Sequence, residues 1–277
     1  MTGISGIACI LNELGYCHES LSLIKKSING DSKDSTFKSG LSGIGIAMVY
    51  FFKKTSDRIF FLEAIRLGEQ ILKELELRKR NEWLKDNEIQ FGLMNGYSGC
   101  SIFFCLLYEL TQDNTYLKNA VDSIEDDLRV RALAIKTNYP DKGEQYHRNE
   151  AFILNAEISI CICIDFLSKF TNTANFTSEI EQIFDGISNR FYIDSSFYRG
   201  IGNLFLLYAI DSEKISLEDI VSALDIFLVE KDGSVYLPTR GAYRLSSDFQ
   251  SGASGILLGI ECAIQKNPLN WLIIDLK

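Results

Sequence analysis

The segment GLSGIGIAMVYFF at residues 40–52 begins with two glycines at positions i and i+3 and continues as an unbroken apolar run. A similar pair of small residues opens an apolar run at six places in the chain. The first residues of these pairs are Gly3, Gly40, Gly96, Ala156, Gly200 and Gly252, which lie 37, 56, 60, 44 and 52 positions apart. Each interval has room for two helices and their loops, so the chain is predicted to repeat a helical hairpin.

The two helices of each hairpin are expected to differ in polarity. The run after each small-residue pair is apolar on all sides, which is typical of a buried inner helix. The stretches between have apolar residues at the three-to-four spacing of a half-buried outer helix. The examples are Phe60, Ala64, Leu67, Ile71 and Leu75 in one stretch, and Leu117, Val121, Ile124 and Leu128 in another. This alternation predicts an all-α fold, namely an α/α toroid that buries every inner helix. An open solenoid with polar terminal caps is the alternative.

The small residues lie at the starts of the predicted inner helices, where close backbone approach or positive φ is needed. The first amides of a helix have no partner within it, and they carry the positive end of the helix dipole. In a toroid these amides would point at the ring centre. We therefore expect the functional site there.

Length and composition predict one domain over residues 1–277, with 46% hydrophobic residues and only three prolines. The net charge of −9 argues against nucleic acid as a partner. No apolar run reaches the ~18 residues of a membrane span, and no signal peptide is visible. The first small-residue pair follows Met1 almost at once, so we expect the chain to be a fragment of a longer protein.

Six of the seven cysteines lie within apolar stretches, namely Cys9, Cys100, Cys105, Cys161, Cys163 and Cys262. They are predicted to be reduced core residues. Cys161 and Cys163 would lie about 200° apart on a helix, so they cannot chelate one ion together. The chain has two histidines, His18 and His147, and no Cys-x-x-Cys motif. No metal site is therefore expected.

Several motifs, taken in order, resemble one family. The small-residue repeat is similar to that of the LanC-like cyclases. The closing segment RLSSDFQSGASGILL at residues 244–258 resembles the C-terminal signature of class III lanthipeptide synthetases. Two further motifs are similar to family motifs: LMNGYSG at residues 93–99, followed by YELT at 108–111, and FYRG at 197–200. The resemblance covers nearly the whole chain.

The resemblance implies a carboxy-terminal cyclase domain in a bacterial, cytoplasmic enzyme. Its upstream lyase and kinase domains would dehydrate Ser and Thr in a precursor peptide. The cyclase would then add a peptide cysteine thiol to the dehydrated residue and form a lanthionine or a labionin. The family toroid usually has seven inner helices, so one repeat is expected before Met1.

The chain departs from the family pattern at the metal site. Zinc-dependent relatives have a cysteine near the penultimate motif and a Cys-His pair before the last one. The corresponding positions here are Tyr198, Gln250 and Ser251. The histidine that acts as a proton shuttle in those relatives aligns with Asn95 or Asn155. The resemblance therefore implies a zinc-independent cyclase without a cofactor.

A thiol with a pKa of about 8.5 is only a few per cent thiolate at neutral pH, so a metal-free site needs a cation or oriented donors. We assign Arg199 or Arg244 to stabilising the thiolate and the enolate, and His147 or Tyr198 to proton transfer. Asp248 would orient one of these groups. The predicted substrate-binding residues are Asn95, Tyr97, Asn155, Gln250 and Ser251.

Each assignment has a structural alternative. Arg244 and Asp248 are four residues apart and could form an ion pair on the last turn. Arg199 could cap a loop, Tyr198 could be a core aromatic residue, and His147 could lie at the surface. Asn95 and Asn155 look like helix caps.

Two other functions remain open. The domain could be a non-catalytic scaffold that holds the peptide for the kinase and lyase domains. It could also be a carbohydrate-active toroid with two opposed carboxylates. Only Asp248 and Glu157 lie near predicted helix starts for that role.

Overall fold

The computed structural model describes residues 3–28, 34–80, 91–137, 157–188, 195–198, 200–238, 245–250 and 252–272. The chain divides into two compact units. Unit 1 comprises Met1–Gly143, Phe166–Thr171 and Ile273–Lys277, and unit 2 comprises Glu144–Asp165 and Asn172–Leu272. Each unit is described by itself.

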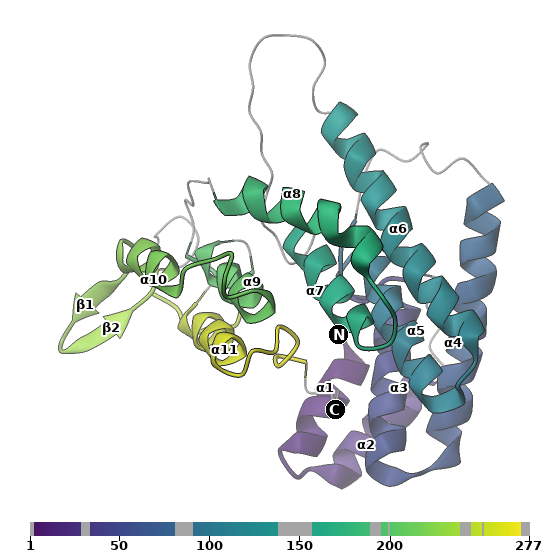
Figure 1. Cartoon of the computed structure of the whole chain (residues 1–277). Coiled ribbons are helices and arrows are strands. Elements are labelled where there is room, and N and C mark those ends of the chain that lie inside the picture. Colours follow the sequence, from purple (N-terminus) through teal and green to yellow (C-terminus); the bar gives the residue numbers. More distant parts are fainter. Residues whose placement is uncertain are drawn as a thin grey trace. The chain divides into compact units, whose positions relative to one another are not determined.

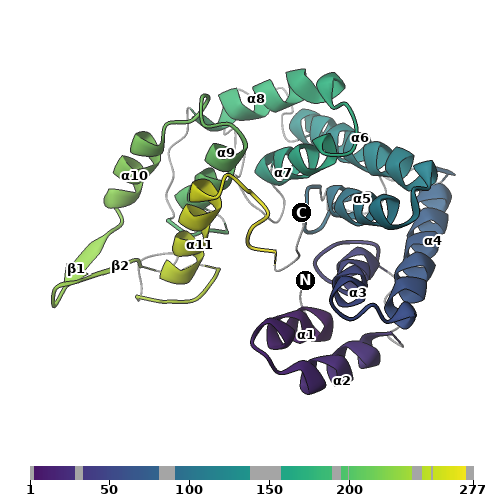
Figure 2. The same cartoon turned by 60° about the horizontal axis from the view of Figure 1, so that its bottom comes forward.

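Unit 1 is built from three helical hairpins (Figure 1). They are α1 (Ile4–Glu13) with α2 (Cys17–Ser27), α3 (Leu41–Thr55) with α4 (Arg58–Arg80), and α5 (Ser98–Thr111) with α6 (Asn114–Thr137). The first helix of each pair is an inner helix, and α3 packs against α1 on one side and α5 on the other (Figure 2). The predicted hairpin repeat is confirmed in this unit.

The second and third hairpins of unit 1 turn in the same way. Ser56 and Gln112 both have a φ of 58° and end α3 and α5 in the left-handed conformation. The next residue caps the outer helix: the Asp57 carboxylate accepts from the Ile59 amide at 3.0 Å, and Asp113 accepts from Thr115 at 2.8 Å. The sequences Thr-Ser-Asp and Thr-Gln-Asp thus encode one turn, because an aspartate side chain satisfies a free helix amide.

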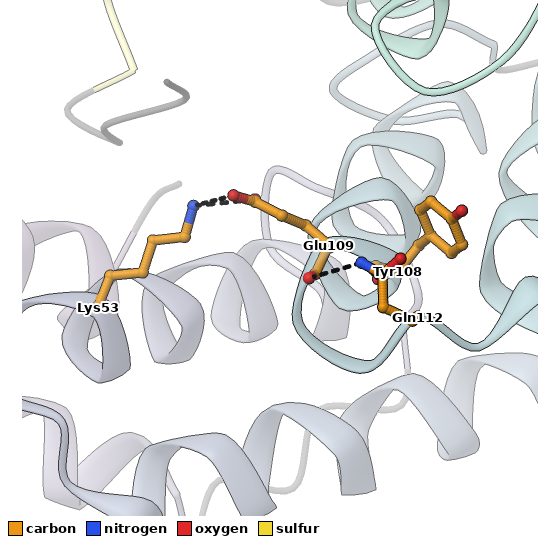
Figure 3. Close-up of polar contacts among 4 residues, drawn as sticks. All are labelled: Lys53, Tyr108, Glu109 and Gln112. Carbon is orange, nitrogen blue, oxygen red and sulfur yellow. Dashed lines mark hydrogen bonds and ion pairs between the residues drawn. The ribbon is translucent and has the colours of Figure 1, made fainter.

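The ends of α3 and α5 that lie away from the small-residue pairs are joined by an ion pair. Figure 3 shows the Lys53 ammonium group 2.9 Å from the Glu109 carboxylate. The Gln112 side chain donates to the carbonyl oxygens of Tyr108 and Glu109 at the end of α5. Since both charged groups are partly exposed, the pair contributes less than about 1 kcal/mol.

Unit 2 carries the rest of the described elements. Its elements are α7 (Glu157–Ser168, which runs past Asp165 into the range of unit 1), η2 (Ala174–Phe176), α8 (Thr177–Ser188), η3 (Ile201–Asn203), α9 (Leu204–Ile210), α10 (Leu217–Asp225), β1 (Val229–Lys231), β2 (Ser234–Tyr236) and α11 (Ala253–Ile264). The inner helices α9 and α11 pack against each other, and α10 packs on α9. The five small-residue pairs that lie wholly within the described residues are at or beside the start of a helix.

A short β-hairpin in unit 2 was not predicted. Strands β1 and β2 are antiparallel, with Val229 opposite Tyr236 and Lys231 opposite Ser234. The turn residues Asp232 and Gly233 have φ angles of 52° and 71°. An Asp-Gly pair between strand-forming residues is a strong hairpin signal. The hairpin could have been found from that signal, but the helical repeat led us to expect helices throughout.

Burial agrees with the inner-helix prediction in the middle of the repeat but not at α1 and α11. Every described residue of α5 from Ser98 to Leu107 is buried, and the apolar residues of α3 and α7 are almost all buried as well. In contrast, α1 exposes Ile4, Ile7 and Ile10, and α11 exposes Leu257 and Ile264. The contacts of α1 run to α2 and α3, so its remaining face is left uncovered in unit 1.

The outer helices also show one difference from the predicted pattern. The predicted face of α4, from Phe60 to Leu75, is buried as expected. On α6 the buried residues are Tyr116, Ala120, Ser123, Ile124, Asp127 and Arg131. Three of the four residues predicted to be buried there, Leu117, Val121 and Leu128, are only half-buried. The buried face thus includes three polar residues, Ser123, Asp127 and Arg131.

The six cysteines predicted to be core residues are buried and form no disulfide, whereas Cys17 is exposed. No helix among the described residues is both long enough and apolar enough to cross a bilayer.

Candidate functional site

The loops that precede the inner helices fold back over the first helical turn. A Cβ atom on Gly43, Gly99 or Gly255 would lie less than 3.0 Å from the carbonyl oxygen of the residue six positions earlier, which is Phe37, Leu93 or Phe249. No real Cβ atom tolerates that approach. The second glycine of each pair is thus required by the backbone of its own loop, and it keeps the loop at the helix start.

In unit 1, the loops before α3 and α5 lie side by side. The Lys38 amide donates to the Met94 carbonyl oxygen at 3.0 Å. The Cys100 thiol donates to the Ser35 carbonyl oxygen at 3.1 Å. The first bond joins the two loops, and the second ties the loop before α3 to the first turn of α5. The predicted substrate-binding residues Asn95 and Tyr97 lie on the loop before α5.

The loop before α5 is held by Asp127, which is fully buried on the outer helix α6. Its Oδ1 accepts from the Tyr97 amide at 2.9 Å. Its Oδ2 accepts from the amides of Gly92 and Ser98 at 2.7 and 2.8 Å, and from the Ser98 hydroxyl at 2.5 Å. One carboxylate therefore caps α5 from a neighbouring helix and fixes the loop that contains Asn95.

The surroundings of Asp127 disfavour the ionisation of its carboxyl group. Burial raises the pKa of Asp127 to about 7, although the hydrogen bonds from Ser98 and Gly92 lower it. Removing a carboxylate from water disfavours its charged form, and only the donors around it make ionisation possible near neutral pH. The loop before α5 is consequently held by a group that titrates close to neutrality.

A second carboxylate does the same for the loop before α3. Glu74 of α4 accepts a short hydrogen bond from the Ser35 hydroxyl. Within the loop, Asp34 accepts from the amide and the hydroxyl of Thr36. Outer helices thus hold the loops at the starts of the inner helices through buried or half-buried acids.

Sequence reasoning missed Asp127 and Glu74. The available signal was an acidic residue on the apolar face of an outer helix, since Asp127 follows Ala120 and Ile124 at helical spacing. Such a residue is rarely buried without a partner. The helix-cap interpretation of Asn95 is wrong, because the N-cap residue of α5 is Tyr97 and the cap acceptor is Asp127. Asn95 itself is half-buried, and Tyr97 is buried.

In unit 2, the loops before α9 and α11 are also joined. The Tyr198 amide donates to the Gln250 carbonyl oxygen at 3.3 Å. The rings of Phe197 and Phe249 lie with their centroids 5.3 Å apart. Phe197 is completely buried, and Gly202, Gly255 and Gly259 all approach it closely. This aromatic pair therefore anchors the two loops, and it brings two predicted site residues together.

Tyr198 and Gln250 differ in exposure. Tyr198 is half-buried and Gln250 is exposed. The partial exposure argues against the interpretation of Tyr198 as a core aromatic residue. The two positions resemble those of zinc ligands in zinc-dependent relatives, but a phenol and an amide do not belong to the thiolate, imidazole and carboxylate set that binds zinc. The residues present therefore do not fit that metal. Across the described part of the chain, no three His, Cys, Asp or Glu side chains are grouped as a metal site.

Asp248 lies in the turn that leads into α11. Its carboxylate accepts from the Ser246 hydroxyl at 2.5 Å, and its backbone carbonyl accepts from the Gly252 amide at 3.1 Å. The side chain is exposed. Among the described residues, Asp248 is thus a turn-forming residue on the same loop as Gln250. Its predicted role in orienting an arginine stays a prediction.

Five predicted site residues lie outside the described residues. They are Arg199, Arg244, His147, Asn155 and Ser251. The predicted ion pair between Arg244 and Asp248 is therefore also untested. Glu157, named in the carbohydrate alternative, begins α7 and is 5% exposed.

Burial keeps four of the six buried thiols protonated. Burial raises the pKa of Cys9 and Cys105 to about 12 and that of Cys262 to about 11, and it also raises the pKa of Cys100. Because the thiolate is the reactive form, these cysteines are poor nucleophiles. An electrophilic ligand would therefore not readily alkylate these four thiols.

Comparisons with known proteins point the same way as the motifs. A family model described as "Lanthionine synthetase C-like protein" matches residues 1–152, which is more than half of the 277 residues. A search of curated proteins gave no match. The segment at residues 244–258, which suggested class III, lies outside the matched range.

Among solved structures, the chain is similar to "Nisin cyclase". The TM-score is 0.61 with 16% sequence identity, and the match covers 95% of this chain and 73% of that chain. At this identity the likeness shows the fold alone. The predicted all-α fold of the α/α toroid class is thereby confirmed.

Proposed function

The chain belongs to the lanthionine synthetase C-like family, and from this membership we propose that it is a lanthipeptide cyclase domain that works without zinc. It adds cysteine thiols of a precursor peptide to dehydrated Ser or Thr residues in the same peptide. Family membership also argues against the carbohydrate-active alternative.

The pairing of Tyr198 with Gln250 carries the zinc-independent part of the proposal. Their loops are joined by a backbone hydrogen bond of 3.3 Å and by the Phe197–Phe249 contact. Positions that resemble those of zinc ligands are therefore still neighbours in unit 2, while their side chains are a phenol and an amide. A folded site without metal-binding groups supports a reaction that uses hydrogen-bond donors and cations instead.

The reaction is the addition of a thiol to the double bond of a dehydrated residue, and it needs no oxidant or reductant. The sulfur forms a bond to Cβ of the dehydrated residue, and the Cα–Cβ π bond breaks. The electron pair moves to Cα and its carbonyl oxygen as an enolate. The proton lost by the thiol is replaced by one delivered to Cα. A general base, a general acid and donors for the enolate oxygen are needed.

We assign Tyr198 to proton transfer, because this half-buried residue lies on the loop that is bonded to Gln250. His147 is the second candidate for this role. Arg199 and Arg244 are proposed to stabilise the thiolate and the enolate, with Asp248 orienting one of them. Asn95, Tyr97, Asn155, Gln250 and Ser251 are proposed to contact the peptide.

The closing segment at residues 244–258 supports a more specific assignment to the class III synthetases. The partners would then be upstream lyase and kinase domains, and the enzyme would act in the bacterial cytoplasm.

A matched pair of variants tests the role of Tyr198. Tyr198→Phe removes the proposed proton donor, and Tyr208→Phe removes a hydroxyl from another half-buried tyrosine of unit 2. Both are mixed with a chemically dehydrated precursor, and free thiol is counted by alkylation and mass spectrometry. Tyr198→Phe should slow thiol loss by about 100-fold, the usual contribution of a general acid or base, while Tyr208→Phe should not. Equal rates for the two variants would remove Tyr198 from the mechanism.

Tyr198 and Gln250, which stand in place of zinc-binding residues, also favour the alternative that the domain is a non-catalytic scaffold for the peptide. A scaffold would bind the peptide but leave thiol loss at the rate of a protein-free control. Measuring peptide binding alongside thiol loss therefore separates the two functions.

A further inference from the structure

The loop at residues 91–97 closes around a carboxylate that belongs to another helix. Asp127 of α6 accepts from the amides of Gly92, Tyr97 and Ser98 and from the Ser98 hydroxyl, at 2.5 to 2.9 Å. A Cβ atom on Gly96 would lie 2.6 Å from the Oδ2 atom of Asp127 and even closer to the backbone of the loop. The loop therefore fits around the carboxylate without space for a side chain at Gly96.

The loop before α3 is held in a different way. Its acid from the outer helix, Glu74, accepts from the side chain of Ser35, whereas Asp127 accepts from three backbone amides. Two of those amides, from Gly92 and Tyr97, lie on either side of Asn95. The path of the backbone around this predicted substrate-binding residue thus depends on Asp127.

Other titratable and charged groups lie near this carboxylate and its neighbour Cys100. They are Asp126 and Arg131 on α6, Cys100 itself on α5, Glu74 on α4, and Asp34 on the loop before α3. Asp126 adds to the effect of burial in disfavouring the charged form of Asp127. The Cys100 thiol stays protonated, because burial and the nearby acids raise its pKa. Acids outnumber the one arginine of this set, so nearby charge as well as burial favours a protonated Asp127 in the closed loop.

We propose that Asp127 is a positioning residue for the peptide substrate, because the closed loop that it holds presents Asn95 and Tyr97 to the peptide. The loop opens as a local step in which the rest of unit 1 stays folded, and opening brings the Asp127 carboxyl group into water. The assignment to a peptide rests on the proposed function. The local opening rests on the hydrogen bonds and the burial of Asp127.

Opening of the loop should be linked to the release of a proton. In the closed loop the pKa of Asp127 is about 7, and its ordinary value is 3.8. Between these values the closed loop holds a proton that the open loop loses. The equilibrium constant for opening should therefore rise about tenfold per pH unit and level off above about pH 7.

Hydrogen exchange of single amides in the whole ¹⁵N-labelled chain tests this linkage from pH 5 to pH 7. The rates at Gly92, Tyr97 and Ser98 should rise about 100-fold per pH unit, of which about tenfold is the base-catalysed exchange step and about tenfold is the opening. The Gln112 amide at the other end of α5 bonds to the Tyr108 carbonyl oxygen and should rise only about tenfold. A tenfold rise at all four amides would overturn the link to Asp127. A 100-fold rise at all four would mean that the whole protein unfolds, and it would overturn the local opening.

Two serine variants show whether the carboxyl group of Asp127 is the one that titrates. Ser98→Ala removes a donor that lowers the pKa of Asp127, so the pH at which the steep rise ends should move upward. Ser123→Ala removes a buried hydroxyl that bonds within α6, to the Asn119 carbonyl oxygen, and should leave that pH unchanged. A merely structural role of Ser98 would speed exchange without moving this pH, and that result would overturn the assignment to Asp127.

Peptide binding is measured on the same amides. The probe is the chemically dehydrated precursor with its cysteines alkylated, so that it binds without reacting. At ten times its Kd it should slow exchange at the three loop amides about tenfold, because binding to the closed loop makes opening rarer, and leave Gln112 unchanged. Unchanged loop exchange with saturating peptide would overturn the positioning role.

The two proposals can fail separately. Protection of the loop amides by the peptide, without thiol loss from the unmodified precursor, would reject the cyclase and keep the role of Asp127. Thiol loss without protection of these amides would keep the cyclase and reject the role of Asp127.

Discussion

The backbone amide of Tyr198 donates to the carbonyl oxygen of Gln250 at 3.3 Å, and this bond joins the loops before α9 and α11. The two positions resemble those that hold zinc ligands in zinc-dependent relatives. The backbone relationship between them is therefore present without the side chains that zinc requires. Such a site can be tested by restoring those side chains.

The triple variant Tyr198→Cys, Gln250→Cys, Ser251→His should gain a zinc site. It would supply two thiolates and an imidazole, a donor set that zinc binds well with water as a fourth ligand. After dialysis against zinc and removal of free metal, elemental analysis should find about one zinc ion per chain. The wild type and the control Tyr208→Cys should retain almost none. A triple variant that folds but binds no zinc would contradict the arrangement of these loops.

Replacing Asp127 should destabilise the fold. Asp127→Asn leaves an amide group facing several N–H donors, so the free energy of unfolding should fall by about 3 kcal/mol. Glu125→Gln changes a partly exposed acid on the same helix and should change it by less than about 0.5 kcal/mol. Urea unfolding of both variants measures the difference. Similar midpoints would show that Asp127 does not hold the loop before α5.

Asp127 should also make stability depend on pH. Its folded pKa of about 7 lies above the ordinary value of 3.8, so between these values the folded state binds a proton that the unfolded state has lost. Its contribution is fully present below about pH 4 and is lost as the pH rises through 7. The advantage of the wild type over Asp127→Asn should shrink from pH 5 to pH 8. An advantage that grows with pH would mean that the buried carboxyl has a lowered pKa instead.

Gly255→Ala should be strongly destabilising. The new Cβ would collide with the Phe249 carbonyl oxygen and press on Phe197, and both belong to the loops that carry Tyr198 and Gln250. A loss of about 3 kcal/mol or more in the free energy of unfolding is expected. In Gly68→Ala the new Cβ meets the end of the flexible Leu107 side chain, and alanine favours the helix by about 1 kcal/mol. That control should change the free energy of unfolding by less than about 1 kcal/mol. Equal losses would argue against the close approach at Gly255.

Thiol labelling of the native protein should be confined to one cysteine. Cys17 is exposed, and the other six are buried. Burial also raises the pKa of Cys9, Cys100, Cys105 and Cys262, which keeps them in the unreactive thiol form at neutral pH. Iodoacetamide at pH 7.5 followed by peptide mapping should modify Cys17 alone, and urea should make all seven reactive. Rapid labelling of Cys100 in native protein would contradict its burial.

Much of the fold could be predicted from the sequence, because its signals are local. The pair Gly40 and Gly43 shows where an inner helix begins, and the spacing from Phe60 to Leu75 shows which face of α4 is buried. The β-hairpin at Asp232 and Gly233 had a local signal too, and it was overlooked. The exposed faces of α1 and α11 could not be foreseen, since they depend on which neighbours cover each helix.

Less of the candidate site could be predicted from the sequence. Tyr198 and Gln250 were singled out by a resemblance, but only the folded chain shows that they are bonded to each other across 52 residues. Asp127 was missed because its partners, from Gly92 to Ser98, lie about 30 residues earlier. Pairings of this kind arise from packing between helices, which a pattern along one chain does not contain.

Ring formation without a metal can be measured as thiol loss from a chemically dehydrated precursor. The wild-type chain is mixed with the precursor, with and without a strong zinc chelator, beside a protein-free control. Thiol loss should be much faster than in the control and unchanged by the chelator. A rate equal to the control, or a rate abolished by the chelator, would contradict the account.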